Sequence, residues 1–306
     1  MSRSVAVPSA AEHIPVLERE VCDLLCPKEG ETVLDATLGL GGHSQVFLTM
    51  IGQEGRLIGL DCDGENLALA RERLRSSALQ CDFRHANFRS IAELGLPTLD
   101  AIFADLGLSS PHIDDPSRGF TFRTEAELDL RFDRSQGEKA SEVIAALPEA
   151  VLARTFSSFG ELPGALRLAH AVKTDRPLTT TALAECVRRV FGYRAPTLLP
   201  RVFQALRMQV NDEMGSLRDF LSAAPALLAP GGRLAVISYH SLEDRMTKNT
   251  FRALTEEAKD DRTGASIGMA PFTLLTRKPI RPSEAEVSGN PRSRSAHLRA
   301  ILKRPV

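Results

Sequence analysis

Short apolar runs alternate with amphipathic stretches through the first third of the chain. The apolar runs predict buried strands at residues 32–36, 57–61, 83–86 and 99–105. Helical spacing of the apolar positions predicts helices at 16–25, 43–51 and 65–75. Strands and helices that alternate in this way predict an α/β fold with a doubly wound, mostly parallel sheet. Such sheets bind ligands outside the carboxyl ends of their strands.

The pattern changes after residue 105. Residues 106–115 are rich in Gly, Ser and Pro, which indicates a loop, and a polar stretch follows at 116–136. Short helical runs are expected at 140–146, 148–160 and 181–191. We therefore expect residues 113–197 to be an inserted helical domain that recognises the substrate, and residues 1–112 and 198–306 to form the core domain.

The sheet is expected to resume after this insertion. A long amphipathic stretch at 198–228 leads to a turn at 230–232 and a strand at 233–239. Residues 272–276 and 297–302 can supply a terminal hairpin.

Composition excludes several classes of protein. The 306 residues, 43% of them hydrophobic, suffice for an ordinary packed core. No apolar run approaches the roughly eighteen residues that cross a membrane, and residues 1–8 lack the apolar core of a signal peptide, so we expect a cytoplasmic protein. The five scattered cysteines indicate reduced thiols and no metal site. A net charge of -1 argues against a generally basic nucleic-acid binder, so such binding would need local patches.

A turn with the sequence DATLGLGGHS, at residues 35–44, directly follows the first predicted strand. A strand that breaks into glycines brings backbone N–H groups close to a ligand. Four residues fall on the positions of the acidic-x-Gly-x-Gly-x-Gly pattern of S-adenosylmethionine enzymes, with threonine in place of the first glycine: Asp35, Thr37, Gly39 and Gly41. The alternative is a tight strand-to-helix turn that binds nothing.

Asp61 ends the second predicted strand, roughly twenty residues past the glycines. Doubly wound folds place there the carboxylate that accepts from ribose hydroxyls, so Asp61 is the expected ribose acceptor. The alternative is that Asp61 merely caps the helix that starts near residue 64.

Three further stretches carry a family resemblance: residues 105–120, SYHSLEDR at 238–245 and NPRSRSA at 290–296. Together with the glycine turn they closely resemble the RsmH (MraW) family. Its members are methyltransferases that modify the exocyclic N4 of a cytidine in the decoding region of bacterial 16S ribosomal RNA. The resemblance covers nearly the whole chain, from His13 to Arg299, and includes residues 128–133 and 203–207.

The resemblance implies a cofactor, a partner and site residues. The cofactor would be S-adenosylmethionine and the partner 16S rRNA within the small ribosomal subunit; a homodimer is left open. The implied cofactor-binding residues are Gly41, Gly42, His43, Asp61, Phe88, Asp105 and His112. His112 is a departure, since the family commonly has glutamine there. Two further departures, at 159–162 and 197–201, lie in or beside the insertion and leave substrate contacts there less secure.

The chemistry of the implied reaction selects Asp105. A cytosine amino nitrogen has a delocalised lone pair and becomes nucleophilic only as it sheds a proton, so an acceptor must hold its N–H groups in line with the sulfonium methyl. Asp105 is the first candidate for this catalytic acceptor, with a backbone carbonyl near Ser109 or Ser110 as the alternative. Asp105 could instead serve only the cofactor. A carboxylate beside a sulfonium cation should stay ionised.

RNA contacts are expected from two regions. The target base must leave its stack to reach the pocket, and Tyr239 and His240 are candidates to stack on it; the alternative is packing at a strand end. Arg292 and Arg294 are candidates for phosphate contacts. Between Arg277 and Arg304 eight Lys or Arg side chains stand against two acids, so this region is locally basic.

Three competing functions deserve comparison. A methyltransferase acting on the C5 carbon of cytosine would need a cysteine nucleophile after the fourth strand, and no cysteine lies between Asp105 and Thr181. A nicotinamide dehydrogenase would share the glycine turn and Asp61 but leave the 109–112 loop unexplained. The third alternative is an RNA-binding assembly factor that binds the cofactor only as a structural ligand. Only a measurement of methyl transfer distinguishes it from an enzyme.

Overall fold

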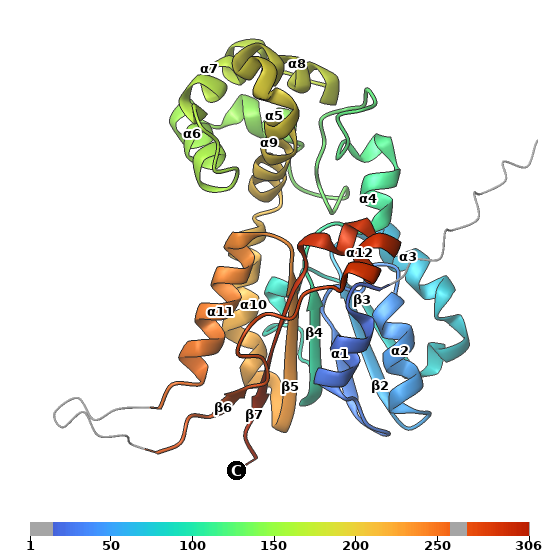
Figure 1. Ribbon diagram of the computed structural model, residues 1–306. Coiled ribbons are helices and arrows are strands. Elements are labelled where there is room, and N and C mark those ends of the chain that lie inside the picture. Colours follow the sequence, from blue (N-terminus) through green and yellow to red (C-terminus); the bar gives the residue numbers. More distant parts are fainter. Residues whose placement is uncertain (1–14, 258–267, 306) are drawn as a thin grey trace, which may run out of the picture.

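A computed structural model describes residues 15–257 and 268–305 of the chain. It contains a seven-stranded sheet with the order β3-β2-β1-β4-β5-β7-β6 (Figure 1). The strands are β1 (Thr32–Asp35), β2 (Arg56–Asp61), β3 (Cys81–His85), β4 (Leu99–Asp105), β5 (Leu228–Ser238), β6 (Phe272–Leu274) and β7 (His297–Lys303). β1 to β5 pair in parallel, whereas β7 is antiparallel to both β5 and β6. The predicted doubly wound, mostly parallel sheet and its terminal hairpin are confirmed.

Helices cover both faces of this sheet (Figure 1). The helices of the described residues are α1 (Glu18–Leu25), α2 (Gly42–Ile51), α3 (Gly64–Arg73), α4 (Ser110–Asp114), α5 (Ala140–Ala146), α6 (Glu149–Ser158), α7 (Ala165–Asp175), α8 (Thr180–Phe191), α9 (Ala195–Val210), α10 (Glu213–Leu227), α11 (Ser241–Leu254) and α12 (Glu284–Gly289), of which α5 to α9 do not cover the sheet. Short 3-10 turns are η1 (Arg75–Gln80), η2 (Phe88–Ser90), η3 (Pro116–Arg118), η4 (Gly192–Arg194) and η5 (Pro291–Ser295).

Alternation along the strands divides the core between the two faces. Val33 packs in a hydrophobic cluster with residues of α1, α2 and α3, whereas the next residue, Leu34, packs with residues of α10 and α11. Both side chains are fully buried. A parallel sheet that is covered on both sides needs apolar residues at successive positions, which explains the continuous apolar runs in the sequence.

Two sequence-based expectations after the insertion are wrong in detail. The amphipathic stretch at 198–228 is two helices, because the chain turns at Asp212, whose φ is 44°. Asn211 fixes that turn, since its amide donates to the carbonyl of Leu130 and accepts from the N–H of Phe132. The glycine turn expected at 230–232 lies inside β5, at an irregularity in its pairing with β4.

Helices α5 to α9 lie beyond the carboxyl ends of the parallel strands (Figure 1). Their apolar side chains form a separate hydrophobic cluster, which also includes Leu128 and Leu130. We call α5 to α9 the helical lobe. The expected boundary at residue 197 falls inside α9, and apolar residues of that helix as far as Leu206 pack in the cluster of the lobe. The division of the chain into domains, and the role of 113–197 in substrate recognition, stay predictions.

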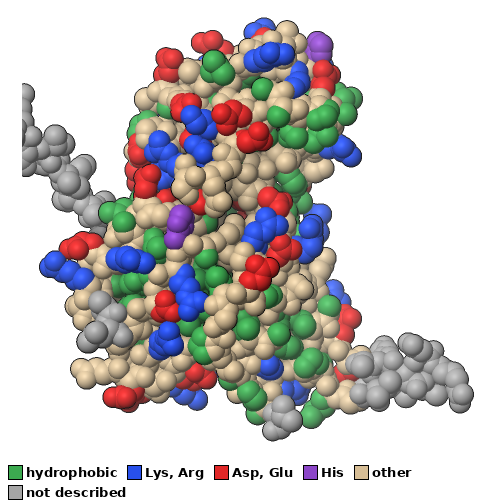
Figure 2. Space-filling view, turned by 180° about the vertical axis from the view of Figure 1, so that it is seen from behind, with side chains coloured by type: hydrophobic (Ala, Val, Ile, Leu, Met, Phe, Trp, Pro, Cys, Tyr) green, Lys and Arg blue, Asp and Glu red, His purple; other side chains and the backbone are tan. Residues whose placement is uncertain are grey.

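Two surface properties bear on function. None of the helices formed by residues 15–257 and 268–305 is both long and apolar enough to cross a membrane. On the face shown in Figure 2, Lys and Arg side chains are interspersed with Asp and Glu rather than gathered in one patch. His13, part of the family resemblance, lies outside the described residues.

Candidate active site

A pocket opens at the carboxyl ends of β1, β2 and β4, where ligands of doubly wound sheets bind. Among the residues that line it are Asp35, Thr37, Gly39, Gly42, His43, Asp61, Asn66, Phe88, Asp105, Ser109, His112 and Tyr239. Its lining also includes Phe132, Asn211, Glu213, Ser216 and Glu243. Gly41, Ser110, His240, Arg292 and Arg294 do not belong to its lining.

The glycine turn builds the floor of the pocket. Gly39 and Gly41 have φ values of 54° and 75°, which favour glycine, and Gly42 begins α2. The N–H of Gly39 donates to Asp61 across 2.7 Å. Thr37, the departure from the glycine pattern, accepts a hydrogen bond from the N–H of Asp105 across 2.6 Å. Its hydroxyl therefore ties the turn to the end of β4, a contact that glycine could not make.

Gly41 does not line the pocket, and the structure shows it in a packing role. Its N–H donates to the carbonyl of Leu38, and a Cβ at this position would lie 2.9 Å from a methyl group of Leu74. His43 lines the pocket, and its Nε2 lies 2.9 Å from the carbonyl oxygen of Val16. The cofactor contacts expected of Gly41, Gly42 and His43 stay predictions.

Asp61 stands at the end of β2, as the sequence predicts for a ribose acceptor. It accepts hydrogen bonds from the N–H groups of Gly39 and Asp63. Burial raises the pKa of Asp61 to about 7 against these bonds, and the charges of Asp63 and Asp35 add to the shift. The capping alternative is wrong, because Asp63 is the N-cap of α3 and accepts from Glu65.

Asp105 and Tyr239 meet in the pocket from β4 and the end of β5. The Tyr239 hydroxyl donates to Oδ1 of Asp105 across 2.8 Å. Burial raises the pKa of Asp105 to about 7, the Tyr239 bond opposes the shift, and the charges of Asp35 and Glu243 support it. Among the described residues Tyr239 is the one side chain that hydrogen-bonds this carboxylate. Oδ2 is thus available to accept from a bound amine.

His112 lies in the pocket wall with both ring nitrogens engaged. Its Nδ1 accepts from the N–H of Ser109 across 3.1 Å, and its Nε2 lies 2.9 Å from Oδ2 of Asp63. Arg118, itself buried, donates to the same Asp63 oxygen across 2.8 Å. Asp63 keeps a depressed pKa of about 2; burial opposes this shift, while His112 and Arg118 produce it. The expected cofactor contact of His112 would have to come from the rest of its ring.

The sequence patterns did not identify Phe132 and Asn211 as residues of the pocket. Phe132 presents an aromatic ring there and stacks on His112, with ring centroids 5.1 Å apart. Asn211 holds the backbone of Phe132 from the α9–α10 turn. The family resemblance at 128–133 was the available signal for Phe132, but its contact with the turn depends on tertiary packing.

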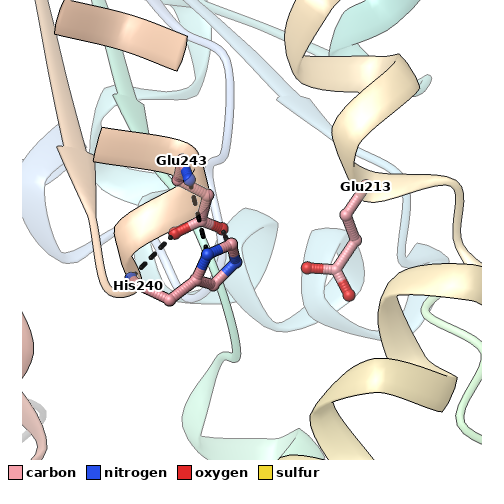
Figure 3. A group of neighbouring side chains, drawn as sticks. All are labelled: Glu213, His240 and Glu243. Carbon is pink, nitrogen blue, oxygen red and sulfur yellow. Dashed lines mark hydrogen bonds and ion pairs between the residues drawn. The ribbon is translucent and has the colours of Figure 1, made fainter. Parts of the chain in front are cut away.

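Glu213, His240 and Glu243 form a group at the pocket, with one possible ligand atom from each within 4.8 Å of the others; Glu243 is buried and the other two are half-buried (Figure 3). Their geometry could hold a cation, but most of their oxygens are already engaged. Arg207 donates to both oxygens of Glu213, and Oε2 of Glu243 accepts from the N–H groups of Tyr239 and His240. The ion pair of Arg207 with Glu213 therefore fixes the start of α10, and the bonds of Glu243 to backbone N–H groups fix the start of α11.

Of the four residues expected to bind RNA, only Tyr239 lies in the pocket. Tyr239 is in the pocket, whereas His240 is the N-cap of α11 and accepts from the N–H of Glu243. Arg292 donates to the hydroxyl of Ser110 and to Asp114, which joins η5 to α4. Arg294 is exposed in η5. Their RNA contacts, and the catalytic roles of Ser109 and Ser110, stay predictions.

The seven-stranded sheet with its antiparallel β7, the glycine turn after β1 and the acid at the end of β2 define a class I S-adenosylmethionine-dependent methyltransferase. The family model described as the MraW methylase family matches residues 10–304. The ribosomal RNA small subunit methyltransferase H of Syntrophotalea carbinolica is 43% identical over 314 residues, which cover 95% of this chain and 98% of that protein. Its counterpart from Trichormus variabilis is 41% identical over 309 residues, covering 99% and 96%. The chain belongs to the MraW methylase family.

Proposed function

We propose that this protein transfers a methyl group from S-adenosylmethionine to the exocyclic N4 of a cytidine in the decoding region of 16S rRNA. The names of its relatives support small-subunit rRNA as the substrate, and the RsmH resemblance supports the N4 atom. The observation that carries the chemistry is Asp105, a pocket carboxylate with one oxygen fixed by Tyr239.

The pocket fits the cofactor in charge and shape. Asp35, Asp61 and Asp105 face a space into which Gly39 brings bare backbone, and a positive ligand would favour their charged forms. We assign Asp61 to the ribose hydroxyls, Phe88 to the adenine side and Gly42 with His43 to the methionine side. When bound, S-adenosylmethionine supplies an electrophilic methyl group on a sulfonium.

The chain's own residues would orient the amine. Oδ2 of Asp105, in the ionised form, accepts a hydrogen bond from one N–H of the base, which aligns the nitrogen, and then receives the proton that the nitrogen loses as its bond to the methyl carbon forms. The Tyr239 hydroxyl holds the carboxylate in one orientation from Oδ1. Phe132 supplies an aromatic surface in the lining of the pocket, on which the flipped base would stack.

The partner is proposed to be 16S rRNA within the small ribosomal subunit in the cytoplasm. The helical lobe would contact RNA around the target, and Arg294 with the other cations between 277 and 304 would contact phosphates. Arg292 would have to exchange its bonds to Ser110 and Asp114 for a phosphate.

The test is methyl transfer from labelled S-adenosylmethionine to small subunits from a strain that lacks this protein. Mass spectrometry should identify N4-methylated cytidine. Asp105→Asn, which keeps the shape but accepts and donates differently, should lose about 10²–10⁴-fold in kcat while still binding cofactor. Label in another nucleoside, or full activity of the variant, would overturn the assignment.

A further inference from the structure

Asp63, His112 and Ser109 form a continuous hydrogen-bonded chain in the pocket wall. His112 is 4% exposed and Asp63 2% exposed, so water does not replace these bonds. The N–H and the hydroxyl of Ser109 both reach Nδ1 of His112, at 3.1 and 3.0 Å. Because the N–H must donate, Nδ1 is the unprotonated nitrogen and Nε2 donates to Asp63.

This series of hydrogen bonds extends to two other pocket residues. Asn66 donates to the Ser109 hydroxyl across 3.1 Å, and the N–H of Asp63 donates to Asp61 across 2.8 Å. The network thus joins the proposed ribose acceptor to the 106–110 loop, next to Asp105. A change at His112 acts on both sides of the cofactor space.

We infer that His112 is a positioning residue for methyl transfer, whose neutral ring holds Ser109 in the pocket wall and whose protonation releases it. This inference rests on the proposed function. A protonated Nδ1 would point its own hydrogen at the N–H of Ser109, and two donors cannot bond each other. The Ser109 hydroxyl, 3.0 Å from Nδ1, could then accept from the ring, but the backbone N–H of Ser109 would lose its acceptor, and with it the bond that fixes the end of the loop before Ser109.

The surroundings favour the neutral ring. Burial lowers the pKa of His112; Asp63 opposes this, and the cations Arg118 and Arg207 add to the shift. Arg118 already occupies the Asp63 oxygen that faces Nε2, and its own further acidic partner, Glu65, lies 3.5 Å away. Phe120 and Phe132 pack on the ring without offering charge.

Glutamine separates positioning from titration. Its amide offers one acceptor and one donor group, so His112→Gln can keep both bonds while losing the ionisable ring. His112→Ala loses both bonds. His170→Gln is the matched control, because His170 is an exposed histidine on α7, paired with Glu149 and outside the pocket lining.

The kinetic test measures kcat for small subunits at saturating S-adenosylmethionine from about pH 5 to 9, with cofactor affinity determined at each pH. His112→Gln should keep kcat within about threefold at pH 8, and His112→Ala should lose about tenfold or more. Toward acid pH, wild type and His170→Gln should fall further than His112→Gln by about the factor that His112→Ala loses, because His112 becomes protonated in addition to Asp105. His112→Gln should fall by about tenfold per pH unit.

A second readout needs no substrate. The amide resonance of Ser109, followed by NMR, should titrate together with the His112 ring in wild type and should not titrate in His112→Gln. An unchanged Ser109 resonance, or a loss of kcat at acid pH as large in His112→Gln as in wild type, overturns the inference. Failure of wild type to methylate any small-subunit RNA at pH 8 overturns the proposed function instead, while the NMR result still decides the coupling.

Discussion

Three carboxylates at neighbouring strand ends give the pocket its electrostatic character. Burial raises the pKa of Asp35 to about 6, that of Asp61 to about 7 and that of Asp105 to about 7. Hydrogen bonds from backbone N–H groups or hydroxyls limit each shift without removing it. Carboxylates whose pKa lies near 7 are easily ionised by a cationic ligand, so the pocket suits a sulfonium better than a neutral molecule.

The ionisation of Asp105 sets the first prediction. An acceptor must be deprotonated, so kcat/KM for S-adenosylmethionine, which reports the cofactor-free pocket, should rise with pH through about 7 and level off above it. Tyr239→Phe removes the bond that lowers this pKa, so the rise should move to higher pH while the plateau persists. Initial rates between about pH 6 and 9, measured in the His112→Gln background, isolate Asp105. A pH-independent rate in that range would show that Asp105 is not the titrating acceptor.

Single residues also show what sequence patterns can and cannot reveal. Asp61 and Asp105 are found where strand-end reasoning expects them, because a buried parallel strand leaves a clear apolar signal. Thr37 looked like a defect in a glycine pattern, and its bond to the N–H of Asp105 joins residues 68 positions apart. Arg292 looked like a free cation, yet it bonds Ser110 and Asp114. Such long-range partners leave no local trace in the sequence.

At the scale of elements, the 116–136 segment differs most from its expectation. The sequence indicates only a polar stretch, but Arg118 enters the interior, where it donates to Asp63 and to the carbonyl of Phe132. The segment thereby carries Phe132 to the pocket. By contrast, the strands other than β5, together with α5 and α8, match their predictions closely, because their periodicity and caps are local properties. The break between α9 and α10 depends on Asn211 bonding this distant segment.

Gly119 provides a test of how tightly that segment is held. It has a φ of 78°, and a Cβ there would lie 2.6 Å from the carbonyl oxygen of Glu127. Gly119→Ala should therefore cost about 2–4 kcal/mol in the free energy of unfolding, from backbone strain plus overpacking. Gly231→Ala is the control, since Gly231 has a φ of 81° with nothing within 4 Å, and should cost about 1 kcal/mol. Urea denaturation of both variants gives the comparison, and equal costs would mean that the segment yields to the extra methyl group.

At the scale of the whole molecule, the site lies between two separately packed bodies. The sheet and the helical lobe have separate hydrophobic clusters, and Asn211 and Arg118 connect them beside the pocket. The sequence predicts each body from local pattern. It does not predict their junction, because that junction consists of side-chain bonds to backbone groups rather than of apolar periodicity.

The stability of the cofactor-free protein should fall as pH rises from about 5 to 8. Asp35, Asp61 and Asp105 have folded-state pKa values of about 6, 7 and 7, above the unfolded value of 3.8, so their contribution is fully present below pH 3.8 and is lost as pH rises through 6 to 7. His112, whose pKa is lowered, opposes this trend below the ordinary histidine pKa of 6.5, but it is one group against three. A sulfonium beside the carboxylates favours their charged forms, so S-adenosylmethionine should protect the protein more at pH 8 than at pH 6, whereas its neutral thioether product should not.

Urea midpoints at both pH values, with each ligand and without, measure this, and Asp105→Asn should flatten the pH dependence. A midpoint that rises with pH in the cofactor-free protein would mean that these carboxylates are ionised in the empty pocket, and the pocket would then bind cations through preformed charge rather than through charge induced by the ligand.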